Sequence, residues 1–374
     1  GAVGTSSASA TRGPTIKLEP APVRAADPST LLVWTSSPLP GGLGLGARLA
    51  QLPGVDQVTT VRAGTVPLVA SWDGEGQPVD RPPAGFIIGL DTMAFDPATY
   101  PAFLPLSARA TFERLGAQQA ILGATSARVR RLGVGATLQL GDGRRYTVAA
   151  VVDDRLVGAT ELTVSMASAA VQLPPSYLLV GYHGDRGQLE RAITGTIAGI
   201  APLKASVRFR GPGETPFLRQ GDAVLAQVFI KERFGEFAYR VGAGTQIVED
   251  PTWAAENIVA ADVPILGRIR CHRALIPLLE GALRELERRN LAFLIDRATF
   301  EGCWNPVLIA SGGDLSRHAW GVAVDLNYGK NPTGAASGQD PRLVQVMESW
   351  GFTWGGPWLV PDPTHFEYVQ PPQA

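Results

Sequence analysis

The segment SRHAWGVAVDLN, residues 316–327, decides how this chain is interpreted. It places His318, one of only four histidines in 374 residues, seven residues before Asp325. The residues between them are mostly small and apolar. The small and β-branched residues at 321–324 are typical of a strand that enters a core, and such a strand would carry Asp325 to a defined depth.

A second segment, WGGPWLVPDPTHFEYV at 354–369, places Asp362 three residues before His365. Two neutral imidazoles and one carboxylate form a common catalytic Zn²⁺ shell that leaves a fourth position for water. His318, Asp325 and His365 would supply that shell. Asp362 would then be the spare carboxylate, able to take a proton from water and pass it to a leaving amine.

Structural roles explain the same residues equally simply. A histidine in an apolar segment is more often a hydrogen-bonded core residue than a metal ligand, and Asp362 in PDPTH could cap a turn. His183 in GYHGDRG and His272 in RCHRAL fit such roles, so we leave both out of the shell. Spacing alone leaves a metal site and a structural role open.

Length and composition describe a folded protein of two domains. The chain is long for a single domain, and its apolar fraction of 45% and charged fraction of 18% are those of a globular protein. A formal net charge of −1, with no basic stripe, argues against nucleic acid as a partner. The chain contains no run of eighteen apolar residues that could span a bilayer.

The N-terminal half has an α+β texture. Residues 1–30, rich in Gly, Ala, Ser, Thr and Pro, are typical of a flexible leader. This leader is either the remnant left after removal of a signal peptide or membrane anchor, or an ordinary disordered N-terminus. Residues 31–205 contain short strands, a hairpin at 136–150 around Asp-Gly, and helices for which Ser107 and Ser126 are N-cap candidates.

A linker at 206–221, rich in Gly and Pro, precedes a second α+β domain at 222–374. Here 272–290 predicts an amphipathic helix, and 340–351 predicts a helix with Asp340 as N-cap, Pro341 at its first position and Gly351 after its end. The metal-like residues lie between and after these helices. Two cysteines are present, and their number alone fits free thiols or one disulfide.

The two histidine segments resemble the zinc D,D-peptidase family of VanY-type D-alanyl-D-alanine carboxypeptidases and phage-type L-alanyl-D-glutamate endopeptidases. The family pattern is S-x-H-x-x-G-x-A-x-D, then a W-G-G element, then an acidic residue three positions before His. Ten positions match it: Ser316, His318, Gly321, Ala323, Asp325, Trp354, Gly355, Gly356, Asp362 and His365. The resemblance extends over roughly residues 220–370.

The resemblance implies an α+β domain with a small antiparallel sheet that holds one Zn²⁺ and hydrolyses peptide bonds in peptidoglycan stem peptides. It implies that His318, Asp325 and His365 are the zinc ligands, that Asp362 is the general base and that Ser316 contacts substrate or a ligand. Extracellular members of the family pair the cysteines that correspond to Cys271 and Cys303.

One departure from the family concerns activity. Members commonly carry an arginine before the S-x-H segment, in GCWNPR, where it is thought to bind substrate or to steady the oxyanion. This chain has GCWNPV, with Val307 at that position. Arg297 or Arg317 could substitute, and the alternative is a catalytically silent zinc-containing module that binds peptidoglycan or regulates a partner.

Residues 31–205 resemble, more loosely, the extracytoplasmic core domain of MacB-type ABC-transporter permeases. The segments that carry this likeness include FIIGLDTMAF and GVGATLQLGDGRRYTVAAVVDD. The resemblance implies an extracytoplasmic protein, membrane-anchored at full length, whose N-terminal domain contacts a membrane or transporter partner. An unrelated α+β accessory domain is the alternative.

Overall fold

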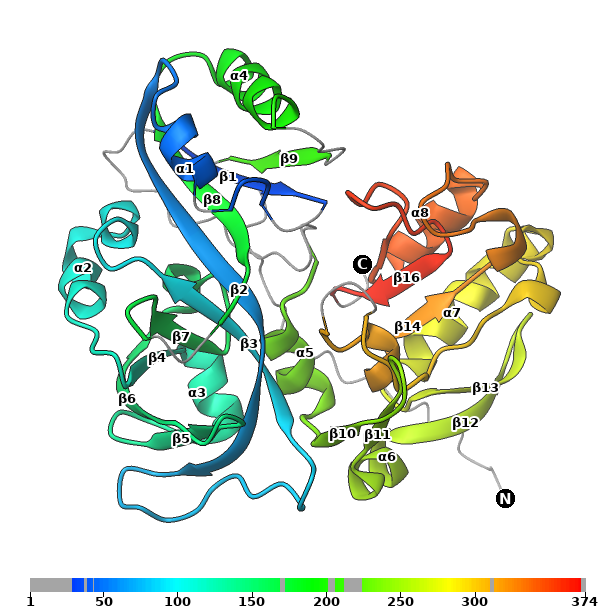
Figure 1. The fold of residues 1–374 in the computed structure, drawn as a ribbon. Helices are drawn as coiled ribbons and strands as arrows, with labels where there is room; N and C mark the ends of the chain where they lie inside the picture. The colour runs from blue at the N-terminus through cyan, green and yellow to red at the C-terminus, as the bar shows by residue number, and fades with distance from the viewer. Residues whose placement is uncertain are drawn as a thin grey trace.

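A computed structural model of the chain describes residues 29–36, 39–42, 44–168, 172–200, 206–211, 224–309 and 313–370. It confirms an α+β fold of more than one domain (Figure 1). We refer to residues 29–211 as the N-terminal part and to residues 224–370 as the C-terminal part. Nearly all of the predicted leader, 1–30, lies outside the described ranges. No helix within those ranges is both long and apolar enough to cross a membrane.

The N-terminal part is built around β2 (Val55–Trp72), a long strand whose two halves pair with different sets of strands. One half of β2 pairs with β3 and β5, and the pairing order β2-β3-β7-β4-β6-β5 returns to β2, which closes a ring. Apolar side chains from these strands form a common core. The other strands of the ring are β3 (Ile88–Phe95), β4 (Gln119–Gly123), β5 (Thr137–Leu140), β6 (Arg145–Val152) and β7 (Leu162–Ser165).

The expected hairpin at 136–150 is confirmed as β5 and β6, with Gly143 at φ 84° in its turn. The helices expected near residues 107 and 126 are α2 (Leu106–Glu113) and α3 (Ala124–Arg130). Ser107 and Ser126 lie inside these helices, so the prediction that they are N-caps was wrong. The Ser126 hydroxyl instead donates to the Glu161 carbonyl.

The first half of β2 pairs with β8 (Pro175–Tyr182), β8 pairs in turn with β1 (Ser29–Thr35), and β1 pairs with β9 (Val207–Arg210) at the edge of the sheet. Helices α1 (Gly44–Leu49) and α4 (Arg186–Ala198) cover one face of these strands. The predicted linker at 206–221 therefore begins with a strand of the large sheet. Residues 212–223 lie outside the described ranges, and the domain boundaries stay a prediction.

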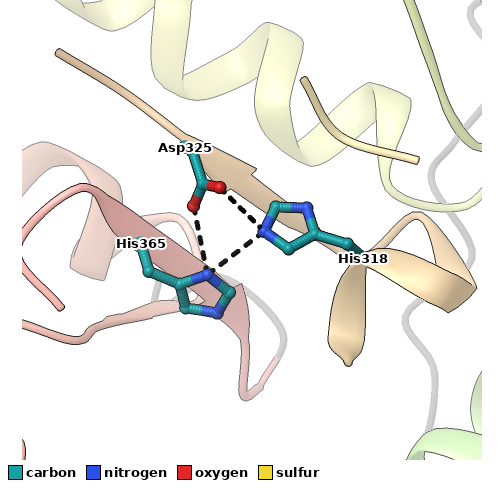
Figure 2. Close-up of side chains that lie close together, drawn as sticks. All are labelled: His318, Asp325 and His365. Atoms are coloured by element: carbon teal, nitrogen blue, oxygen red, sulfur yellow. Dashed lines mark hydrogen bonds and ion pairs between the residues drawn. The ribbon is translucent and has the colours of Figure 1, made fainter. Parts of the chain in front are cut away.

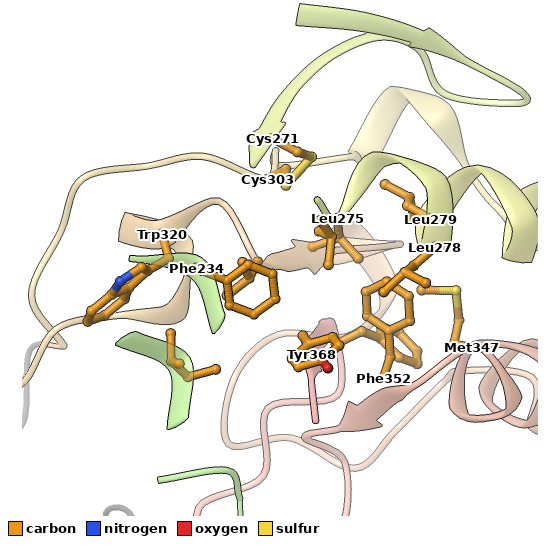
Figure 3. Packing of buried hydrophobic residues seen from close by; sticks show 14 of the residues in the cluster. Phe234, Cys271, Leu275, Leu278, Leu279, Cys303, Trp320, Met347, Phe352 and Tyr368 are labelled. Atoms are coloured by element: carbon orange, nitrogen blue, oxygen red, sulfur yellow. A yellow bond between two sulfur atoms is a disulfide. The ribbon is translucent and has the colours of Figure 1, made fainter. Parts of the chain in front are cut away.

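The C-terminal part joins four helices to three small antiparallel sheets around one core, shown in part in Figure 3. Its helices are α5 (Gln227–Phe234), α6 (Pro251–Asn257), α7 (Ile276–Arg288) and α8 (Pro341–Ser349). Its strands are β10 (Tyr239–Val241), β11 (Ile247–Glu249), β12 (Ile258–Val263), β13 (Gly267–His272), β14 (Ala323–Asp325), β15 (Phe352–Trp354) and β16 (His365–Tyr368). Its short 3₁₀ helices are η3 (Ala292–Leu294), η4 (Arg297–Thr299), η5 (Arg317–Trp320) and η6 (Tyr328–Lys330). The N-terminal part has two more, η1 (Tyr100–Phe103) and η2 (Asp154–Val157).

Both helices expected in this part are confirmed. Helix α7 buries Leu279, Ala282 and Leu286 on its inner face. Helix α8 begins as predicted, because the Asp340 carboxylate accepts from the Arg342 amide and Pro341 occupies the first turn.

A disulfide joins Cys271 at the end of β13 to Cys303, beside the N-terminal end of α7 in Figure 3. It ties the loop before the His318 segment to the core, which buries both cysteines. The small antiparallel sheet expected from the sequence is β14-β16-β15, and it carries two of the candidate ligands.

Candidate metal centre

His318 lies in η5, which follows Ser316. The Ser316 hydroxyl accepts from the His318 amide at 3.2 Å, so this serine is the N-cap of the turn. Gly321 ends the turn at φ 66°, where a Cβ atom would meet the His272 amide nitrogen at 2.7 Å. Only glycine suits both the left-handed backbone and the close approach, which explains this position of the motif.

Sheet register brings Asp325 and His365 together. Asp325 is the last residue of β14, His365 is the first residue of β16, and the two are direct partners in the antiparallel pair. Directly opposed residues in such a pair have neighbouring side chains. The strand expected at 321–324 is thus one that delivers Asp325 beside a histidine forty positions further along the chain.

The three side chains converge, as Figure 2 shows. His318 Nε2 lies 3.1 Å from Asp325 Oδ2 and 3.2 Å from His365 Nδ1, and His365 Nδ1 lies 3.1 Å from Asp325 Oδ1. One ligand atom from each residue falls within 4.8 Å of the others. Both histidines are more than 90% buried, while the Asp325 side chain is 21% exposed. The group therefore has one side open to solvent.

The outer nitrogens of both imidazoles bond to the protein. His318 Nδ1 lies 2.8 Å from the Cys303 carbonyl, which only accepts, so this nitrogen carries a proton. His365 Nε2 lies 3.0 Å from Glu367 Oε2 and donates in the same way. In the neutral rings the lone pairs are then on His318 Nε2 and His365 Nδ1, facing Asp325. Two nitrogen lone pairs and a carboxylate aimed at one point fit a divalent cation such as Zn²⁺.

The charges at the centre are strongly perturbed. Burial raises the pKa of Asp325, but the positive charge and hydrogen bonds of the two histidines in their protonated forms outweigh it and hold that pKa well below the usual range. Burial lowers the pKa of His365, yet its bonds to Asp325 and Glu367 raise it to about 10. Without another cation, the converging acceptors hold a proton on His365, and a bound metal ion would replace that proton.

Asp362 comes from the loop between β15 and β16, which we define as the Asp362 loop, residues 355–364. Its carboxylate accepts from the Thr333 hydroxyl at 3.2 Å, and burial raises its pKa against the effect of the nearby His365 charge. Its amide donates to the Gly355 carbonyl at 2.9 Å, and a Cβ at Gly355 would meet the Asp362 carbonyl oxygen at 2.5 Å. The glycine at 355 allows the loop to fold back on itself.

Of the two arginines considered as replacements at Val307, Arg317 lies behind the centre and Arg297 lies beside β13. Arg317 is buried, its Nη2 donates to the Leu225 carbonyl at 2.7 Å, and its Nε lies 3.9 Å from Glu367 Oε1, behind His365. Arg297 lies against Gly267, the first residue of β13. Val307 itself forms an isolated β-bridge with Gln246.

The other two histidines are occupied away from the centre. His183 Nδ1 lies 2.7 Å from Asp56 on the surface. His272 is buried, its Nε2 lies 3.0 Å from the Phe234 carbonyl, and desolvation lowers its pKa to about 4.

Two residues near the centre escaped the sequence interpretation. Glu367, which bonds His365, is two positions further along the same strand and so projects to the same face. That period-two spacing was a readable signal. Trp358, whose ring centroid lies 5.3 Å from that of His365, had no such signal.

Comparison with known proteins places the centre in a family context. Residues 310–368 match the family model described as D-alanyl-D-alanine carboxypeptidase. The match spans both histidine segments, so the C-terminal part contains a peptidase-like domain. No curated protein matches the chain.

The solved structures that are similar to about half of the chain include the following three. The periplasmic region of MacB from Actinobacillus actinomycetemcomitans is 10% identical, with 48% of this chain and 87% of that chain covered and a TM-score of 0.33. A putative permease domain from Porphyromonas gingivalis is 12% identical (51% and 92% covered, TM-score 0.32). The extracellular domain of the transporter YknZ from Gram-positive bacteria is 12% identical (48% and 99%, TM-score 0.33). Both resemblances seen in the sequence recur among these matches.

Proposed function

We propose that this chain is a zinc-dependent peptidase that hydrolyses peptide bonds in peptidoglycan stem peptides. The observation that carries the proposal is the convergence of His318, Asp325 and His365, with the outer nitrogen of each imidazole bonded to a protein acceptor. The family match over 310–368 supports the substrate class. A zinc ion held by these residues would act as a Lewis acid on the scissile carbonyl and make water a stronger nucleophile.

In this proposal Asp362 is the general base. Its raised pKa makes the carboxylate a stronger base, which suits a residue that accepts a proton from water and returns it to the leaving amine. The Thr333 hydroxyl holds the Asp362 carboxylate in place. Cys303 and Glu367 keep the two imidazoles in the tautomers that the ligand role needs, and Ser316 fixes the turn that carries His318.

We further propose an extracytoplasmic location. Peptidoglycan lies outside the cytoplasm, and the buried Cys271–Cys303 disulfide fits an oxidising compartment. By the sequence resemblance, residues 31–205 are a permease-ectodomain-like domain, joined by a linker at 206–221 to a peptidase domain at 222–374. A membrane segment or transporter partner at the N-terminal part belongs to the same proposal.

Val307 favours a second candidate, a zinc-containing module that binds peptidoglycan without cutting it. Loss of a donor aimed at a developing oxyanion costs about 10²–10³ in rate, and the described contacts place Arg317 behind His365 and Arg297 beside Gly267. The two candidates differ in turnover alone, because both keep the three ligands.

The test combines metal content and cleavage. We would incubate zinc-loaded wild type, D362N and a matched control, D262N, with purified peptidoglycan and follow new amino termini. Asp262 is an exposed carboxylate on β12 that pairs with Arg268. We expect wild type and D262N to release termini, and D362N to retain zinc while its rate falls by at least about 10². Zinc retention without new termini in wild type would favour the silent module.

A further inference from the structure

We propose that the N-terminal part is a structural component of the catalytic centre: Trp34 and Arg208 of its sheet edge hold the Asp362 loop in the position that catalysis needs. The inference rests on the proposed function. It assigns positioning roles to residues more than a hundred positions before the histidine segments. Figure 1 shows that one end of the antiparallel pair β1–β9, which carries these residues, faces the red C-terminal segment of the chain.

Strand β1 is buried on both faces, and the two faces pack against different partners. Leu31 and Val33 pack against α1 and α4 within the N-terminal part. Leu32 and Trp34, which point the other way, form a separate cluster with Leu359 of the Asp362 loop. All three are less than 10% exposed, and Trp34 is only 1% exposed. The loop that carries the candidate base therefore buries a leucine in the sheet of the other part.

A hydrogen bond strengthens the contact at the next strand. Arg208 on β9 is the direct partner of Trp34 in the β1–β9 pair, and its Nη2 donates to the Pro357 carbonyl at 2.8 Å. Pro357 and Leu359 flank Trp358, whose ring lies against His365. The sheet edge thus contacts the loop on both sides of the tryptophan that packs on a candidate ligand.

The sheet can act as a fixed support because buried charges join the two parts elsewhere. Glu161 of the N-terminal part bonds Lys231 of α5 at 2.7 Å, and Arg130 of α3 bonds Glu236 at 2.5 Å. Helix α5 in turn reaches the strand that carries His365, since Phe234 packs edge-on against Tyr368 at 4.9 Å. The Thr65 hydroxyl on β2 also donates to Asp314, two residues before Ser316.

These contacts bear on the base more directly than on the metal, although the loop also reaches His365 through Trp358. His318, Asp325 and His365 are held by the C-terminal core and by the bonds to Cys303 and Glu367. The Asp362 loop combines bonds such as that from Thr333 with the contact to the sheet. Loosening that contact should displace Asp362 more than the ligands, and a displacement of about 1 Å can cost about 10² in rate.

The experiment uses the full chain as wild type, L359A, R208A and V360A. Val360 is the matched control, because it is the next residue of the same loop but is 48% exposed. Two readouts are taken: hydrogen exchange of backbone amides in 355–364, and kcat and KM on a stem peptide at equal zinc content. We expect L359A and R208A to exchange faster and to lose kcat by about 10–100-fold with KM little changed, while V360A matches wild type.

Unchanged exchange in both L359A and R208A would overturn the proposal. A rise in kcat would also overturn it, because the sheet would then be blocking the centre instead of supporting the base. If wild type itself does not cleave, the proposed function fails, and the exchange data still decide whether the sheet holds the loop.

Discussion

Two buried polar clusters in this molecule are built on opposite plans. In the first cluster, the carboxylates of Glu161 and Glu236 bond to the cations of Arg130 and Lys231. The second oxygen of Glu161 accepts from the Asp91 amide and the Gln227 side chain. Around Asp325, a carboxylate and two imidazole nitrogens face one another instead. The first cluster contains its own cations, whereas the second presents ligand atoms that could bind an added cation.

The difference matters because burial is costly for any unmatched charge. The Glu161 cluster is neutralised by its own cations and joins the two parts of the chain. The acceptors around Asp325 converge on one point, and hydrogen bonds to the outer nitrogens of the imidazoles fix their orientation for an ion. In this chain those bonds come from the Cys303 carbonyl and Glu367. The comparison predicts that substitutions in the first cluster change stability and that substitutions in the second change metal affinity.

The largest expected effect is in the Glu161 cluster. In E161Q, Arg130 and Lys231 would lose one of the two carboxylates that they bond and keep the other, Glu236, so the free energy of unfolding should fall by about 3–5 kcal/mol. Urea denaturation would measure the loss. The control is E232Q, which removes a more exposed bridge to Arg128 and should cost less than about 1 kcal/mol. Equal effects of the two variants would contradict a special role for the buried cluster.

A carboxyl group buried without a cation should behave in the opposite way to Glu236. Burial raises the pKa of Glu249 to about 8, while Arg130 and Lys231 outweigh burial and lower the pKa of Glu236 to about 2. The folded state thus holds the Glu249 proton more tightly than the unfolded state, and the stability of wild type should fall as pH rises from about 4.5 to 8.

The variant E249Q has no carboxyl group that titrates at this position, so it lacks the part of the pH dependence of stability that comes from Glu249. We expect E249Q to be more stable than wild type at pH 8, by at most about 4 kcal/mol, and to match it near pH 4. Denaturation midpoints at the two pH values measure the difference. A constant difference between the two proteins across this range would show that Glu249 ionises normally in the fold.

The smallest expected effect concerns the bond behind His365. In E367Q a neutral acceptor replaces the carboxylate at His365 Nε2, so the ring becomes a weaker ligand and zinc affinity should fall by about 10–100-fold. Competition with a chromophoric chelator measures the affinity. The control E280Q, on the exposed face of α7, should bind zinc like wild type. Unchanged zinc affinity in E367Q would show that the charge of Glu367 does not strengthen His365 as a ligand.

Spacing alone left a metal site and a structural role open, and the family pattern singled out His318, Asp325 and His365, which the structure brings together. The glycine at 321 and the apolar run before Asp325 specify a turn and a strand, and period-two alternation would have identified Glu367 as well. The patterns did not show that β9 belongs to the large sheet or that α5 packs against Glu161, because those contacts join distant segments. The serine N-caps failed for a related reason: Ser126 bonds a carbonyl 35 residues away rather than its own helix end.

Every proposed step at the centre requires His318, Asp325 and His365 to form one zinc site, and zinc titration of the purified full chain tests this requirement directly. We would titrate wild type, H365A and H183A, the last being a matched control whose histidine pairs with Asp56 on the surface. We predict one tightly bound equivalent in wild type and H183A and none in H365A. Equal zinc binding by wild type and H365A, or no binding by wild type, would contradict the assignment.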